Sequence, residues 1–125
     1  MTVVDAAKSL SFTKQHLNRV LAAWDDPVDW ADLTIYGFYC LEAAVVASAL
    51  HAGLDFRRSH SQKAEAAKEL YLSHDLPDVS GFLWQLNAAR KAVAYGDVDL
   101  PDLDAEDVAR RIEDYVDSVS AFLEE

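Results

Sequence analysis

Cysteine, glycine and proline are scarce in this sequence, which has one, four and three of them among 125 residues. The single cysteine, Cys40, excludes a disulfide framework within the chain and is typical of a reducing compartment. The glycines are too few and too dispersed for a GxGxxG or GxxxxGKS/T loop, which excludes the usual phosphate-cradling motifs. The four histidines are scattered, and HExxH, CxxC and Glu-x-x-His spacings are missing. We therefore expect neither a metal site nor a cofactor.

Basic residues are also scarce: 11 lysines and arginines stand against 22 aspartates and glutamates, and the formal net charge is -11 at pH 7. Because nonspecific affinity for nucleic acid comes from Lys and Arg side chains at phosphates, this balance argues against DNA as a partner. The acidity is uneven, however. Residues 97–125 hold eleven acidic and two basic side chains, whereas the first 96 residues hold eleven and nine. The first 96 residues therefore keep enough cations for a local anion site.

A secretory signal and a long hydrophobic run are missing as well. The start, Met1 to Asp5, has neither the basic residues nor the apolar stretch of about 7 to 15 residues that a signal peptide needs. The most apolar segment, Ile35 to Ala49, is interrupted by Glu42 and is shorter than the ~20 residues of a membrane span. We expect a cytoplasmic protein without a membrane partner, in which this segment is a buried helix.

What is present is a helical pattern. Apolar residues recur at spacings of three and four along most of the chain, and alternating strand patterns are missing. With 125 residues, 51% of them hydrophobic, the chain is expected to form one domain, 1–125. Because short connections make neighbouring helices antiparallel, the sequence predicts an all-α, up-and-down antiparallel helical bundle of four main helices plus one short helix. The predicted helices are Val4 to Trp24, Asp29 or Asp32 to Ala52, Gln62 to Ser73 (the short one), Val79 to Tyr95, and a last helix after Asp104.

Caps and inward faces complete this prediction. Asp29 or Asp32, Asp78 and Asp104 stand where an N-cap side chain accepts hydrogen bonds from the first amides of a helix, and Gly53 and Gly96 where helices end. The residues expected to face inward from the first helix and the short helix are Leu10, Leu17, Val20, Leu21, Trp24, Ala64, Ala67, Leu70 and Tyr71. The last helix has the clearest apolar stripe, formed by Val108, Ile112, Tyr115, Val116, Val119, Phe122 and Leu123.

Three short elements carry a family resemblance. The stretch Leu86 to Asp97 holds an arginine, Arg90, followed by Tyr95-Gly96-Asp97, and it comes after the aromatic Tyr36 to Tyr39 helix start and an Arg58-Ser59-His60-Ser61 loop. In this order and spacing the chain resembles the HEPN superfamily along nearly its whole length. Arg90, Tyr95, Gly96 and Asp97 match the turn that ends the family's penultimate helix, and His60 with Ser61 matches its basic loop.

The resemblance implies a small helical domain, commonly a homodimer, found as RNase toxins, as partners of minimal nucleotidyltransferases, and as non-catalytic nucleotide- or RNA-related binding modules. Catalytic members carry Arg-x4–6-His, whose imidazole and guanidinium act at the scissile phosphate without a metal. Counted from Arg90, the histidine positions hold Tyr95, Gly96 and Asp97. We therefore expect a non-catalytic or weakly catalytic binding module of a toxin–antitoxin or nucleotidyltransferase-linked system, with a nucleotidyltransferase or antitoxin as partner and a nucleotide or RNA as ligand.

Two alternatives stay open. One is a metal-independent endoribonuclease that uses His60 with Arg90, since an imidazole titrates near neutral pH and a guanidinium holds phosphate in two hydrogen bonds. The other is a purely structural or regulatory helical protein without an anion site. The candidate catalytic residues of the endoribonuclease are Arg90 and His60. The candidate binding residues of the binding module are Arg57, Arg58, His60, Glu42, Arg90, Tyr95 and Asp97.

Several candidates also have structural interpretations. Arg90 could pair with Glu42 and so join two helices, rather than hold a phosphate. Tyr95 is expected to be a packed aromatic whose hydroxyl is hydrogen-bonded near the helix end. Trp30, Tyr36, Tyr39 and Trp84 exceed the needs of a small core and are assigned to the interface of a homodimer.

Overall fold

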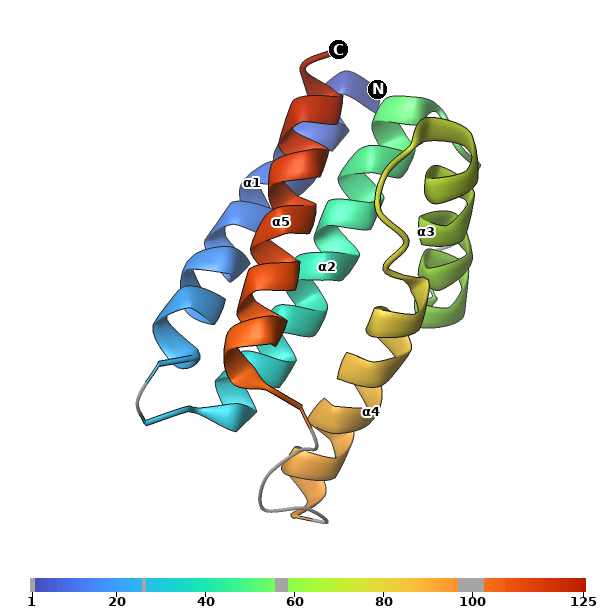
Figure 1. The fold of residues 1–125 in the computed structure, drawn as a ribbon. Helices are drawn as coiled ribbons and strands as arrows, with labels where there is room; N and C mark the ends of the chain where they lie inside the picture. The colour runs from blue at the N-terminus through green and yellow to red at the C-terminus, as the bar shows by residue number, and fades with distance from the viewer. Residues whose placement is uncertain (1, 26, 56–58, 97–102) are drawn as a thin grey trace.

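The computed structural model describes residues 2–25, 27–55, 59–96 and 103–125, with side chains from residue 5 onward. All regular structure in these ranges is helical, which confirms the predicted all-α helical bundle (Figure 1). The five helices are α1 (Thr2–Ala23), α2 (Trp30–Ala52), α3 (His60–His74), α4 (Ser80–Tyr95) and α5 (Ala105–Leu123).

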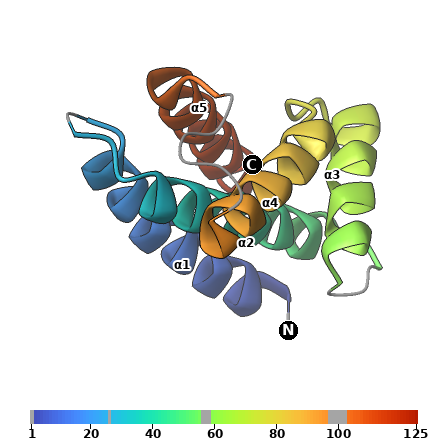
Figure 2. The same cartoon turned by 90° about the horizontal axis from the view of Figure 1, so that it is seen from below.

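The four longer helices form the bundle and α3 stands to one side of it. In Figure 1, α1, α2, α4 and α5 run alternately down and up, and the two termini lie at the same end. Within the described residues α2 is the helix that packs against all four others, whereas α3 contacts α2 and α4 (Figure 2). The apolar helix predicted from Ile35 to Ala49 is therefore the central element.

Helix α2 is a core helix because its side chains are buried in the bundle, not because it is too short to cross a membrane. The helix has 23 residues and is long and apolar enough to cross a membrane by length and composition alone, so the length argument from the sequence is wrong. However, 72% of its most apolar window is buried inside the bundle, as in the core helix of a soluble protein. Leu33, Phe38, Leu41 and Val45 are among its fully buried side chains.

Local hydrogen bonds begin and end the helices mostly where the sequence predicts. The Asp29 carboxylate accepts from the amide of Asp32 at the start of α2, and Asp104 accepts from the amides of Glu106 and Asp107 at the start of α5. Gly53 and Gly96 end α2 and α4 with φ values of 73° and 72°, in the left-handed region that glycine adopts without strain.

Three predicted helix starts differ from the structure, and the first is that of α1, which begins at Thr2 rather than Val4. Helix α3 begins at His60 rather than Gln62, because the Ser59 hydroxyl caps it by accepting from the Gln62 amide. The cap of α4 is Val79 rather than Asp78. The Asp78 carboxylate nevertheless accepts from the amide and hydroxyl of Ser80, so it still satisfies a first-turn donor. The earlier start of α3 matters most, since it brings His60 into a helix.

The apolar stripe of α5 is confirmed, as its first five members are buried and Phe122 and Leu123 pack partly buried against the core. Two inward assignments on other helices are wrong: Leu21 is 37% exposed and Tyr71 is 44% exposed. Each follows a fully buried residue, Val20 or Leu70, by one position, which turns its side chain about 100° around the helix. The buried faces of α1 and α3 are thus narrower than the sequence predicts.

Candidate functional site: an arginine and a histidine at one aromatic ring

Helices α2, α3 and α4 meet around the ring of Phe38, which is buried in α2. The imidazole of His60, the first residue of α3, contacts this ring edge-on with 5.1 Å between the ring centroids. The guanidinium carbon of Arg90, on α4, lies 4.9 Å from the centre of the same ring and 5.8 Å from that of Tyr39. The fold therefore brings together two candidates that are 30 positions apart in the sequence.

The Glu42 carboxylate lies one turn of α2 beyond Phe38 and is buried, with its side chain 7% exposed. Its Oε2 atom is 2.6 Å from Nδ1 of His60, and its Oε1 atom is 3.4 Å from Nζ of Lys63. The expected pair between Glu42 and Arg90 is wrong, since within the described residues the ionic partners of Glu42 come from α3. Removal of these partners would leave a buried charge without compensation, and the folded protein would lose stability strongly.

The hydrogen bond to Glu42 fixes the orientation of His60. An ionised carboxylate only accepts hydrogen bonds, so Nδ1 of His60 is the donor and Nε2 is left for a ligand. The side chain is 47% exposed, so solvent and small molecules reach it. In its neutral form His60 presents a lone pair at Nε2, and in its protonated form it presents an N–H there.

Arg90 is a partly buried cation whose charge has no acidic partner in the described ranges. Its Nε is buried and makes no hydrogen bond there, and Oδ1 of Asn87, three positions earlier on α4, is in the same condition. Aromatic faces attract a guanidinium, which explains how the side chain is held. They do not use its hydrogen-bond donors, and those on the two terminal nitrogens are the ones that can bind an anion.

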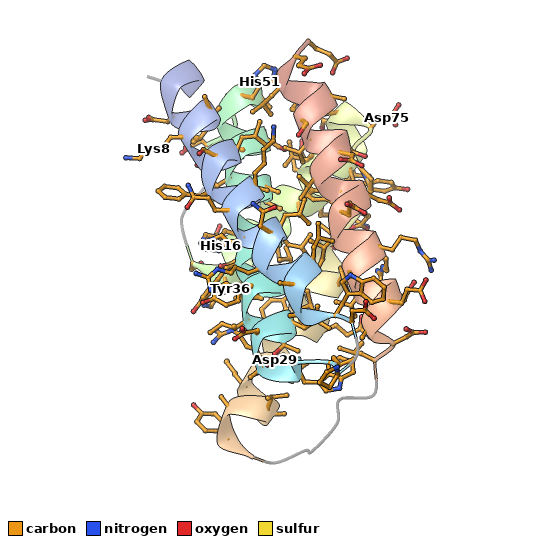
Figure 3. The ribbon with its side chains drawn as sticks, turned by 90° about the vertical axis from the view of Figure 1, so that its left-hand side faces the viewer. Lys8, His16, Asp29, Tyr36, His51 and Asp75 are labelled. Carbon is orange, nitrogen blue, oxygen red and sulfur yellow. The ribbon has the colours of Figure 1, made fainter. Side chains whose placement is uncertain are left out.

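A pocket of about 430 Å³ adjoins His60 between α1, α2 and α3. Its lining includes Phe12 and His16 from α1, Tyr39 and Glu42 from α2, and His60 and Lys63 from α3. The His16 imidazole stacks on the Tyr36 ring at 6.0 Å, and Figure 3 shows these two side chains next to each other on one side of the bundle. Burial, and secondarily the charge of Arg19, lowers the pKa of His16 below 6.5, so its imidazole is neutral at neutral pH.

The other candidates lie elsewhere. Tyr95 is 78% exposed at the end of α4, so the prediction that it is packed is wrong. Arg57, Arg58 and Asp97 lie outside the described residues. Among the aromatic residues assigned to a dimer interface, Trp84 is 52% exposed, whereas Trp30 and Tyr36 pack partly buried against the core. His, Cys, Asp and Glu residues within the described ranges form no group of three that could hold a metal ion.

Sequence reasoning placed Lys63 in a basic region open to an anion and missed its ion pair with Glu42, and it missed the positions of His16 and Phe12 altogether. Lys63 was recoverable, because it follows His60 by three positions and residues at that spacing share one face of a helix. Nothing in the sequence connects His16 or Phe12 to residues of α3, because that proximity depends on how α1 packs on α2.

The cluster at Phe38 thus has the features of an anion site on a helical bundle: a cation that has no acidic partner among the described residues, an imidazole held by a carboxylate, and an adjoining pocket. Comparison with known protein families, with curated proteins and with solved structures gave no match, so the cluster is interpreted from its own geometry.

Proposed function

We propose that the chain is a HEPN-like binding module that holds a phosphate group of a nucleotide or of RNA at Arg90 and His60. The observation that carries the proposal is that the guanidinium of Arg90 and the imidazole of His60 contact one ring, Phe38, while Arg90 has no acidic partner in the described ranges. A phosphate between them would accept hydrogen bonds from the Arg90 guanidinium and, when the imidazole is protonated, from Nε2–H of His60.

The charges of the cluster support an anion as ligand. Lys63 and Glu42 neutralise each other across 3.4 Å, so Arg90 leaves one net positive charge among the four ionisable side chains. Protonation of His60 adds a second. This local charge is notable in a chain whose formal net charge is -11, and it accounts for a small, local anion site rather than an extended nucleic-acid surface.

The partner in this proposal comes from the family resemblance. A module of this kind would act with a nucleotidyltransferase or an antitoxin, and as a homodimer in the cytoplasm. Exposed aromatic surface supports an interface: Trp84 is 52% and Tyr95 is 78% exposed, both on α4. Size-exclusion chromatography with light scattering tests the dimer, and a monomer at micromolar concentration would remove this part of the proposal.

A second function, metal-independent RNA cleavage, is favoured by the 2.6 Å hydrogen bond between His60 and Glu42. A carboxylate that orients an imidazole through Nδ1 leaves Nε2 to take a proton from the 2′-hydroxyl of RNA, as a general base does. Arg90 would then stabilise the charge that develops on the phosphate. The histidine here comes from α3 and not from the Arg-x4–6-His positions, so we place this function second.

The deciding experiment uses a fluorescently labelled, mixed-sequence single-stranded RNA of about ten nucleotides, with EDTA present. Wild-type protein is expected to bind the RNA without cutting it. Arg90→Ala should weaken binding at least tenfold, since hydrogen bonds to charged groups contribute about 1.5–3 kcal/mol each. The matched control is Arg110→Ala, because Arg110 is an exposed arginine of α5 that pairs with Asp107 on the same helix and not with the cluster.

Three results would change the conclusion. Equal binding by Arg90→Ala and Arg110→Ala, with both variants folded by circular dichroism, would overturn the phosphate site. RNA cleavage by the wild type that His60→Ala abolishes would replace the binding module with the endoribonuclease. If RNA, phosphate and nucleotides all leave the melting temperature unchanged, the chain is a structural or regulatory protein, because a ligand selective for the native state must raise it.

A further inference from the structure

The pocket between α1, α2 and α3 has a lining that the phosphate site does not use. Phe12 and Tyr39 line it with rings that are 47% and 37% exposed. His16 adds a third flat ring, with its centroid 6.1 Å from that of Tyr39. Three rings from two helices, left open beside charged groups, are typical of a surface on which a planar ligand stacks.

The pocket and the proposed phosphate site have two residues in common. His60 lines the pocket and also contacts the Phe38 ring beneath Arg90. Tyr39 lines the pocket and also lies 5.8 Å from the Arg90 guanidinium. A ligand that fills the pocket and reaches Arg90 must therefore carry a planar group and an anion on one small scaffold.

We infer that this pocket binds the base of a nucleoside 5′-phosphate whose phosphate lies at Arg90 and His60. The inference rests on the proposed phosphate site and adds to it a base subsite formed by Phe12, His16 and Tyr39. The volume of about 430 Å³ lies within the range of about 300–1,000 Å³ that is usual for small-molecule pockets.

The polar groups of the pocket fit the edge of a base. His16 is neutral at neutral pH, because burial and then Arg19 lower its pKa, so its ring offers one donor and one acceptor. Lys63 also lines the pocket, and its ammonium group has further donors besides the one that it gives to Glu42. Base edges carry alternating donors and acceptors, whereas an acidic peptide or a free phosphate would leave the rings of the pocket unused.

The test compares three ligands that share the same phosphate, using the full chain in isothermal titration calorimetry. AMP and UMP carry a base, and ribose 5-phosphate does not. At least one nucleotide is expected to bind wild-type protein about fivefold or more tightly than ribose 5-phosphate, since stacking one base on an aromatic side chain gives at least this much. Titrating AMP should also shift the Hε1 proton resonance of His16 in NMR spectra.

Two variants separate the subsites. Phe12→Ala should reduce nucleotide binding to the level of ribose 5-phosphate and leave ribose 5-phosphate binding unchanged, whereas Arg90→Ala should weaken all three ligands. The matched control is Tyr71→Ala, because Tyr71 is 44% exposed on α3 and does not line the pocket. Both aromatic residues are half-exposed, so both variants are expected to fold, and the melting temperature checks this.

The outcomes distinguish the inference from the proposed function. Equal affinities for AMP, UMP and ribose 5-phosphate would overturn the base subsite and leave the phosphate site standing. No binding of any of the three would overturn both. A loss in Phe12→Ala no larger than in Tyr71→Ala would also overturn the base subsite. Tighter binding of pentaadenylate than of AMP would support RNA as the source of the nucleotide unit, and the reverse order would support a free nucleotide.

Discussion

Substitution of Gly37 by alanine tests how closely α2 and α5 pack. Gly37 is buried in the interior of α2, and a Cβ atom added there would lie 2.9 Å from Cδ1 of Ile112 and 3.7 Å from Cδ1 of Leu86. The second distance is an ordinary contact, but the first requires Ile112 to move. Ile112 is fully buried on α5, so its side chain has little room to do so.

Two opposing terms set the magnitude. Alanine is favoured over glycine in a helix interior by about 0.5–1 kcal/mol, whereas an extra methyl group in a well-packed core costs about 1–3 kcal/mol. We therefore expect Gly37→Ala to lower the free energy of unfolding by about 1 kcal/mol. For a domain of this size that corresponds to a fall of roughly 4 °C in melting temperature.

A double-mutant cycle with Ile112→Val identifies the cause. Valine lacks the Cδ1 atom that the new methyl group would meet, and alone it should cost about 0.5–1.5 kcal/mol. With that atom gone, the double variant should be at least as stable as Ile112→Val, which gives a favourable coupling of about 1–2 kcal/mol. Urea denaturation followed by circular dichroism measures all three variants. Additive losses within about 0.3 kcal/mol would show that Gly37 and Ile112 do not meet, and the α2–α5 packing would be wrong.

Two further predictions concern titratable groups. Cys40 is fully buried, its thiol donates to the carbonyl oxygen of Thr13 at 3.3 Å, and burial raises its pKa to about 12. It should therefore resist a thiol reagent such as dithionitrobenzoate at pH 8 in the native protein and react at once in guanidinium chloride; prompt native reaction would contradict its burial. His16 should titrate below 6.5 in NMR spectra, because burial and then Arg19 lower its pKa. As the pH falls, His16 takes up its proton at a higher pH in the unfolded chain than in the folded one. The free energy of unfolding therefore keeps the contribution of neutral His16 above pH 6.5 and loses it as the pH falls through the pKa of His16 in the folded chain. Denaturation at pH 8 and pH 5 should accordingly show a larger loss for wild type than for His16→Gln, and equal losses would contradict the assignment.

The helices were predictable because their signals are local. The spacing of apolar residues in α5, the carboxylates of Asp29 and Asp104, and the glycines at 53 and 96 act within a few positions of the chain, and the structure has them where the sequence indicates. The errors lie at helix starts, where neighbouring residues can each take the N-cap position and the sequence does not show which one does. Ser59 begins α3 two residues early, and Val79 takes the cap position beside Asp78.

Three members of the cluster were predictable from the sequence, but their pairings were not. His60, Glu42 and Arg90 were all candidates, and the structure brings them to neighbouring positions around Phe38. The partner of Glu42, however, depends on which of α3 and α4 presents its cation on that side of α2. That choice follows from how α3 and α4 are rotated about their axes and shifted along them relative to α2. The spacing of apolar residues within one helix carries no information on this.

The sequence by itself thus determined an all-helical bundle with α2 as its central helix, because amphipathic periodicity and capping chemistry are properties of short segments. Only the tertiary structure decided that Glu42 holds His60 and Lys63, that Arg90 lies on Phe38 without an acidic partner in the described ranges, and that Phe12 and His16 open a pocket beside them. These contacts are made between side chains of three or four different helices, so they form only when the helices have packed together.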